Sequence, residues 1–166
     1  MIIKIISGGE TGVDRGALDF AIKNGIAHGG WCPQGRLSES GPISSKYNLI
    51  ELPSSSFKAS TSTNVHRSDG TLIITRGAPS GGTGLTVDIC NGSEKPKYVI
   101  DLKHALHPEE FVEWALSKNI LILNVAGPRE SKQSGIRKHT IKTMTVLWRH
   151  LIPAEQANAV IQGGKR

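Results

Sequence analysis

The sequence has few cysteines and few aromatic residues, and its histidines form no metal-binding pattern. Its 166 residues include only two cysteines, and aromatic residues make up 5% of the chain. Two cysteines are too few for a disulfide framework or a zinc-ligand pattern, which favours a reducing, cytoplasmic compartment. The six histidines show no spacing that would place two of them on one helix face beside an acid. We therefore predict no protein-bound metal site.

Long apolar runs are also missing. No run approaches the ~20 residues that a helix needs to cross a bilayer, and the apolar stretch at residues 2–6 is too short for a secretory signal. We expect a cytoplasmic protein with no membrane partner. The length fits a single domain over residues 1–166.

The net charge points to an anionic partner. Basic residues exceed acidic ones, which gives a formal charge of +6 at pH 7. In the last predicted helix the basic residues alternate with apolar ones at amphipathic spacing, as in any solvated helix. Nucleic acid is therefore an unlikely partner, and a phosphorylated small molecule is the better candidate.

Apolar runs alternate with helical patterns along the chain. Strands are predicted at residues 2–6, 47–52, 71–75, 97–102 and 120–125, and helices at 13–24, 54–67, 84–91, 108–118 and 134–151. The segment 29–45 is rich in glycine, proline and serine, and we predict a long loop there. This alternation indicates an α/β fold, an open parallel sheet with helices on both faces in a three-layer αβα arrangement.

Three glycine-rich turns each follow a predicted strand, and all three are predicted to bind a ligand. Their candidate residues are Ser7, Gly8, Gly9, Thr11, Gly12 and Arg15 in the first, Gly81, Gly82, Thr83, Gly84 and Thr86 in the second, and Asn124, Gly127, Arg129 and Ser131 in the third. Glycine lets backbone N–H groups approach a ligand, and a helix N-terminus adds partial positive charge. Because parallel strands end at one edge of a sheet, the three turns predict a phosphate-binding site there.

Further candidates are less specific. Trp31 and Arg36 in the long loop could stack on a heterocycle and pair with phosphate, although Trp31 could equally plug the core. Asp88 is predicted to lie one helical turn after the second glycine-rich turn. It is either an acid that faces the pocket or an acid that stabilises the start of the helix. No nucleophile–base pair is evident, so Asp88 is the one candidate for catalysis, and a binding protein is favoured over an enzyme.

Several motifs in order resemble the molybdenum-cofactor carrier family. They are Ser-Gly-Gly-Glu-Thr-Gly-Val-Asp-Arg at 7–15, Gly-Gly-Trp-Cys-Pro-Gln-Gly-Arg at 29–36, Gly-Gly-Thr-Gly-Leu-Thr at 81–86 and Asn-Val-Ala-Gly-Pro-Arg-Glu-Ser at 124–131. That family belongs to the SLOG superfamily of Rossmann-like folds. The resemblance implies that the chain holds molybdenum cofactor or molybdopterin by its phosphate without turnover, as a homo-oligomer (dimer or tetramer), with molybdoenzymes as possible recipients.

A second resemblance leaves an enzymatic alternative open. Cytokinin-activating nucleotide phosphoribohydrolases, distantly related to that family, carry the motif Pro-Gly-Gly-x-Gly-Thr-x-x-Glu. Here Ser80, Leu85 and Asp88 replace its proline, threonine and glutamate. These departures weaken the hydrolase alternative but leave Asp88 in place to contact a ribose. The residues alone do not decide between a pterin and a purine nucleotide.

Overall fold

A five-stranded parallel sheet forms the centre of the molecule. The computed structural model describes residues 1–163, with side chains as far as Pro153, so the end of the predicted domain, 164–166, lies outside the described residues. The strands are β1 (Lys4–Ile6), β2 (Ala27–Gly29), β5 (Gly70–Thr75), β6 (Lys97–Asp101) and β7 (Ile122–Ala126). They lie in the order β2-β1-β7-β5-β6, and every neighbouring pair is parallel. The predicted α/β fold is confirmed.

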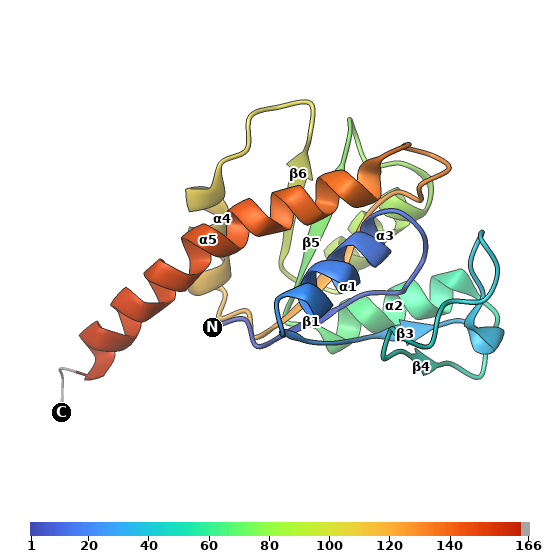
Figure 1. Cartoon of the computed structure of the whole chain (residues 1–166), viewed down its shortest axis with the longest axis horizontal. Coiled ribbons are helices and arrows are strands. Elements are labelled where there is room, and N and C mark those ends of the chain that lie inside the picture. Colours follow the sequence, from blue (N-terminus) through green and yellow to red (C-terminus); the bar gives the residue numbers. More distant parts are fainter. Residues whose placement is uncertain (164–166) are drawn as a thin grey trace.

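Helices cover both faces of this sheet (Figure 1). Helices α1 (Val13–Lys23), α4 (Pro108–Ser117) and α5 (Ile136–Gly163) pack together on one face, and α2 (Phe57–Arg67) and α3 (Gly81–Gly92) on the other. The chain moves across the sheet in opposite directions from β1 to β2 and from β5 to β6. Because such crossovers are right-handed, α1 and α3 must lie on opposite faces. The result is the expected three-layer, Rossmann-like arrangement.

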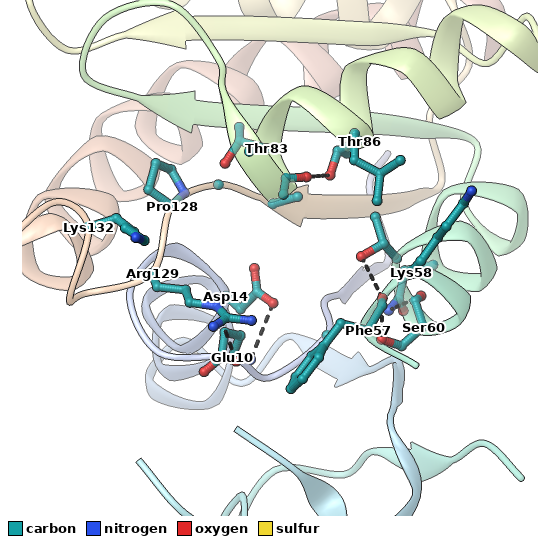
Figure 2. Close-up of a pocket in the computed structure, with 18 of the residues that line it drawn as sticks. Glu10, Asp14, Phe57, Lys58, Ser60, Thr83, Thr86, Pro128, Arg129 and Lys132 are labelled. Atoms are coloured by element: carbon teal, nitrogen blue, oxygen red, sulfur yellow. Dashed lines mark hydrogen bonds and ion pairs between the residues drawn. The ribbon is translucent and has the colours of Figure 1, made fainter. Parts of the chain in front are cut away.

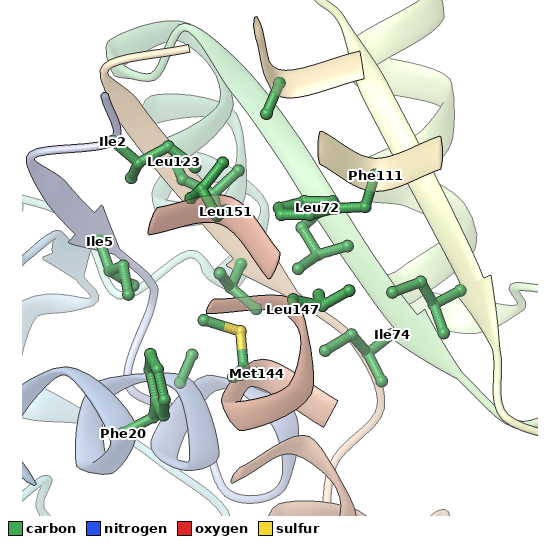
Figure 3. Close-up of a cluster of buried hydrophobic side chains, with 14 of the residues drawn as sticks. Ile2, Ile5, Phe20, Leu72, Ile74, Phe111, Leu123, Met144, Leu147 and Leu151 are labelled. Atoms are coloured by element: carbon green, nitrogen blue, oxygen red, sulfur yellow. The ribbon is translucent and has the colours of Figure 1, made fainter. Parts of the chain in front are cut away.

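The main core lies between the sheet and the layer of α1, α4 and α5. Ile5, Leu72 and Leu123 from the strands meet Phe20 and Met144 from the helices, all fully buried (Figure 3). Strand β5 is buried along its whole length, as expected for a central strand covered on both faces. This packing fixes the strand ends from which the candidate turns leave.

The predicted loop at 29–45 is wrong in part. It contains β3 (Trp31–Cys32) and a 3₁₀ turn, η1 (Gln34–Arg36), and β3 pairs in parallel with β4 (Ile50–Glu51). Strand β2 was not predicted at all. Strands β2 and β3 lack the apolar run that marks β1, and they form here because distant segments supply their hydrogen-bond partners.

Helix α5 runs further than the predicted end at residue 151. It includes Pro153 and continues to Gly163, so its second half extends beyond the sheet (Figure 1). Proline predicts a helix end because it lacks an N–H and crowds the preceding turn, yet here the helix continues through it. Among the described residues, no helix combines the length and apolarity needed to span a bilayer.

Candidate functional site

A cavity of about 610 Å³ lies at the carboxyl edge of the sheet, where β1, β5 and β7 end. This volume is typical of sites for small ligands. Figure 2 shows that side chains converge on it from three sides, namely from α3, from α2, and from the turns that follow β1 and β7. The glycine-rich turns predicted from the sequence therefore do meet at one edge.

The N-terminus of α3 forms the wall best suited to an anion. Gly81 and Gly82 are exposed, and a Cβ at either position would have no neighbouring atom within 4 Å. Neither backbone N–H donates a hydrogen bond within the described chain, and Ser80 makes no side-chain cap. Thr83 adds a buried hydroxyl from the same turn. Free N–H groups and the helix dipole together favour a phosphate at this wall.

The opposite wall is acidic. Glu10 and Asp14 both line the cavity, and Oδ2 of Asp14 accepts a hydrogen bond from the Glu10 N–H at 3.2 Å (Figure 2). Burial raises the pKa of Asp14 from its ordinary value of 3.8 to about 7, and the nearby charge of Glu10 adds to this, although hydrogen bonds from backbone N–H groups oppose it. Asp14 therefore changes its charge near neutral pH.

Glu10 is held in place by backbone contacts. Its Oε1 accepts hydrogen bonds from the N–H groups of Thr11, at 2.8 Å, and Glu39, at 3.1 Å. Its Oε2 is buried without a hydrogen bond in the described chain and lies 3.5 Å from Nε of Arg129. This ion pair neutralises part of the acidic wall.

The mouth of the cavity carries cations and an aromatic ring. Lys58, Arg129 and Lys132 line it, and the guanidinium of Arg129 lies over the ring of Phe57 at 5.0 Å from its centroid. Phe57 is 40% exposed although it is large and apolar. An exposed ring beside cations is suited to stacking on a planar ligand.

The predicted binding residues divide into two groups. Those that line the cavity are Gly8, Gly81, Gly82, Thr83, Thr86, Asn124, Gly127 and Arg129. Those that do not are Ser7, Gly9, Thr11, Gly12, Arg15, Trp31, Arg36, Gly84 and Ser131. Most members of the second group instead form hydrogen bonds or close packing contacts within the protein, as described below.

Three of these, namely Thr11, Arg15 and Ser131, hold the segment 38–41 against the rest of the domain, and this segment is exposed apart from the half-buried Ser38. The hydroxyls of Thr11 and Ser131 both donate to the carboxylate of Glu39. Arg15 donates to Gly9 O at 3.1 Å and to the hydroxyls of Ser38 and Ser40. Their polar atoms are thus used within the protein.

Arg36, Trp31 and Ser7 also have internal roles. Arg36 donates to four backbone carbonyls, those of Ile43, Ser44, Tyr47 and Leu49. The backbone of Trp31 pairs with the buried Asn64 side chain, and its ring lies beside Arg67. The buried Ser7 hydroxyl donates to Val125 O at 2.6 Å, joining β1 to β7.

Gly12 brings two of the turns together. Its φ of +81° is in the left-handed region, and a Cβ there would lie 2.3 Å from the carbonyl oxygen of Pro128. The Val13 N–H donates to that same oxygen at 3.2 Å. Only glycine permits this approach, so Gly12 shapes the cavity without lining it.

Asp88, the one candidate for catalysis, is exposed on α3 and is not among the residues that line the cavity. Neither sequence interpretation of Asp88 holds, because it does not face the pocket and the first turn of α3 contains no acid. In the part of the chain that the structure describes, no group of three or more His, Cys, Asp or Glu side chains could hold a metal ion. The carboxyls that do line the cavity are Glu10 and Asp14.

Comparison with known proteins identifies the family. Residues 5–148 match the model of the circularly permutated YpsA SLOG family. The chain belongs to this family. When β7 is counted as the first strand, the order of this sheet becomes 3-2-1-4-5, the Rossmann order, as expected for a circularly permutated chain.

A solved structure agrees with this assignment. This chain is similar to the "Putative molybdenum carrier protein" from Syntrophus aciditrophicus SB. The two are 45% identical in sequence, the TM-score is 0.84, and the match covers 88% of this chain and 94% of the other. No curated protein matches it. Counted from β7, the strand order reverses between β7 and β5, and the cavity lies at this switch point, where such sheets bind ligands.

Several residues that line the cavity were not predicted from the sequence. Phe57 and Lys58 open α2 in a polar stretch with no glycine turn, and an isolated exposed aromatic was the only signal. Glu10 and Asp14 are four residues apart within the first turn motif, but acidic side chains are not expected partners of an anion, so the glycine pattern does not point to them.

Proposed function

We propose that the chain binds a phosphorylated heterocycle of the molybdenum-cofactor class and holds it in the cavity at the switch point. The phosphate would bind the free N–H groups of Gly81 and Gly82, with Thr83 beside it and Lys58 or Lys132 completing the charge. The ring would lie in the remaining space towards Phe57. The name of the Syntrophus structure supports the cofactor class.

The open N-terminus of α3 is the observation that carries this proposal. Two adjacent exposed glycines with unpaired N–H groups, at a helix of 12 residues, face a cavity with basic side chains at its mouth. A tight turn needs no such open space. An anion-binding site does, because phosphate oxygens must approach the backbone closely.

Native mass spectrometry of the freshly purified chain, followed by identification of any released molecule, tests the proposal. We expect a molybdopterin-type pterin or its fluorescent oxidation product. Gly82→Val should abolish this binding while the fold survives, since its side chain would enter the open space at the α3 N-terminus. Gly92→Val is the matched control, because Gly92 ends the same helix and also faces open space. Equal retention by both folded variants would refute the site.

An N-glycosidic hydrolase would need a different acid from the one that the sequence offered. Asp88 lies outside the cavity, whereas Asp14 lines it and has a pKa of about 7, which suits a general acid. Free base appearing when nucleoside monophosphates are incubated with the protein, and absent with Asp14→Asn, would establish turnover. Intact nucleotide after prolonged incubation supports holding without conversion.

A further inference from the structure

The cavity is polarised from one wall to the other. The α3 N-terminus contributes unpaired donors, and Glu10 and Asp14 contribute acceptors on the β1–α1 turn. A phosphate beside these carboxyls would meet like charge, so it is directed to the α3 wall. The carboxyls must then face another part of the ligand.

Accepting groups of this kind select rings with adjacent N–H donors. An ionised carboxylate only accepts hydrogen bonds. Guanine and pterin present a ring N–H next to an exocyclic amine, so this edge matches a carboxylate bidentately. Adenine alternates an amine with a ring nitrogen lone pair, and hypoxanthine and lumazine lack the amine. The acidic wall therefore favours an amino-oxo pyrimidine edge over the other rings.

The position of the two side chains fits this use. Figure 2 shows Asp14 directed towards the middle of the cavity, on the same side as Glu10 and the stacked side chains of Arg129 and Phe57. Glu10 is fixed by two backbone N–H groups and by the ion pair with Arg129, so it is already oriented. Phe57 at the mouth could cover the face of a planar ring whose edge meets the carboxyls.

We propose that Asp14, oriented with Glu10, is the group that selects the ligand's ring by accepting the N–H donors of an amino-oxo pyrimidine edge. This inference rests on the proposed function, because phosphate binding at α3 sets the direction in which the ring points. Asp14 thus determines specificity, while the glycines of α3 supply affinity for phosphate.

The test uses pairs of probes that differ in one exocyclic group. Titration calorimetry of the full chain at pH 8, above the Asp14 pKa of about 7, would compare GMP with IMP and pterin with lumazine. Hydrogen bonds to a charged group predict about tenfold tighter binding of the amine-bearing member of at least one pair. The pair that shows the preference identifies the ring as a purine or a pterin.

Asp14→Asn supplies the second measurement. The amide oxygen can still accept the Glu10 N–H, while the amide nitrogen presents donors to the cavity, so the preference should fall to about onefold. Asp88→Asn, an exposed acid outside the cavity, should keep the wild-type preference.

The outcomes separate the two proposals. Equal binding of GMP and IMP, and of pterin and lumazine, with nucleotide binding still lost in Gly82→Val, would overturn the role of Asp14 and leave the phosphate site standing. A preference that survives in Asp14→Asn would also overturn it. Failure of GMP, IMP and inorganic phosphate alike to bind would refute the proposed function itself, and this inference with it.

Discussion

Removing the charge of Asp14 should stabilise the fold at neutral and higher pH. Burial raises the pKa of this carboxyl from 3.8 to about 7, so the folded protein resists its ionisation. Stability from this group is fully present below pH 3.8, declines as the unfolded chain ionises, and is lost as the pH rises to about 7. Asp14→Asn removes the ionisation altogether.

The magnitude follows from that interval. At 1.36 kcal/mol per pH unit, the span from 3.8 to about 7 corresponds to roughly 4 kcal/mol as an upper bound. Asp14 lies in the first turn of α1, where loss of a negative charge costs up to about 1 kcal/mol. We therefore expect Asp14→Asn to raise the free energy of unfolding by about 2–3 kcal/mol at pH 8, and by only about 0.5 kcal/mol at pH 4.

Urea unfolding of both proteins between pH 4 and pH 8 measures this difference directly. Other carboxyls titrate in the same range, so the variant is compared with the wild type at each pH. Asp88→Asn, at an exposed position, controls for the change in net charge. A gain that is the same at pH 4 and pH 8, or a loss at pH 8, would refute the argument that the cavity disfavours the Asp14 charge.

Other substitutions separate structural residues from binding residues. Gly12→Ala should cost roughly 3 kcal/mol or more, since a Cβ would meet Pro128 O at 2.3 Å at a positive φ; a urea midpoint near the wild-type value would contradict this. Arg36→Lys should lower the free energy of unfolding by about 2 kcal/mol, because an ammonium group cannot donate to all four carbonyls that Arg36 binds. The affinity for ligand, measured by calorimetry, should not change. Weaker binding by the folded variant would show that Arg36 belongs to the binding site. Burial raises the pKa of Asp19, but hydrogen bonds from Tyr47, Arg137 and Lys46 outweigh it and lower the pKa. Asp19→Asn should therefore cost about 1–2 kcal/mol of stability at pH 7 and progressively less as the pH falls below 4. Thermal unfolding of both proteins across that pH range would check this.

The sequence was enough to predict the layers and the edge of the sheet at which the cavity lies. Strands β5, β6 and β7 are recognisable in the sequence from short runs rich in Val, Ile and Leu, because a sheet with helices on both faces favours apolar, β-branched residues along its strands. The glycine turns follow directly, and parallel strands bring their carboxyl ends to one edge whatever the strand order. Gly82 and Asn124, predicted from local information alone, therefore line the cavity, and their role in binding stays a prediction.

Tertiary structure decided which side chains at that edge face the cavity. Arg15 and Thr11 belong to a predicted turn, yet the segment 38–41 lies against them and takes their hydrogen bonds. Phe57 reaches the mouth only because the connection from β2 to β5 carries α2 across the far face of the sheet. The sequence thus determined where a ligand could bind, through local patterns of burial and backbone freedom. The acidic wall of Glu10 and Asp14 depended on contacts between segments far apart in the chain, since burial and the position of opposing charges are properties of the folded molecule.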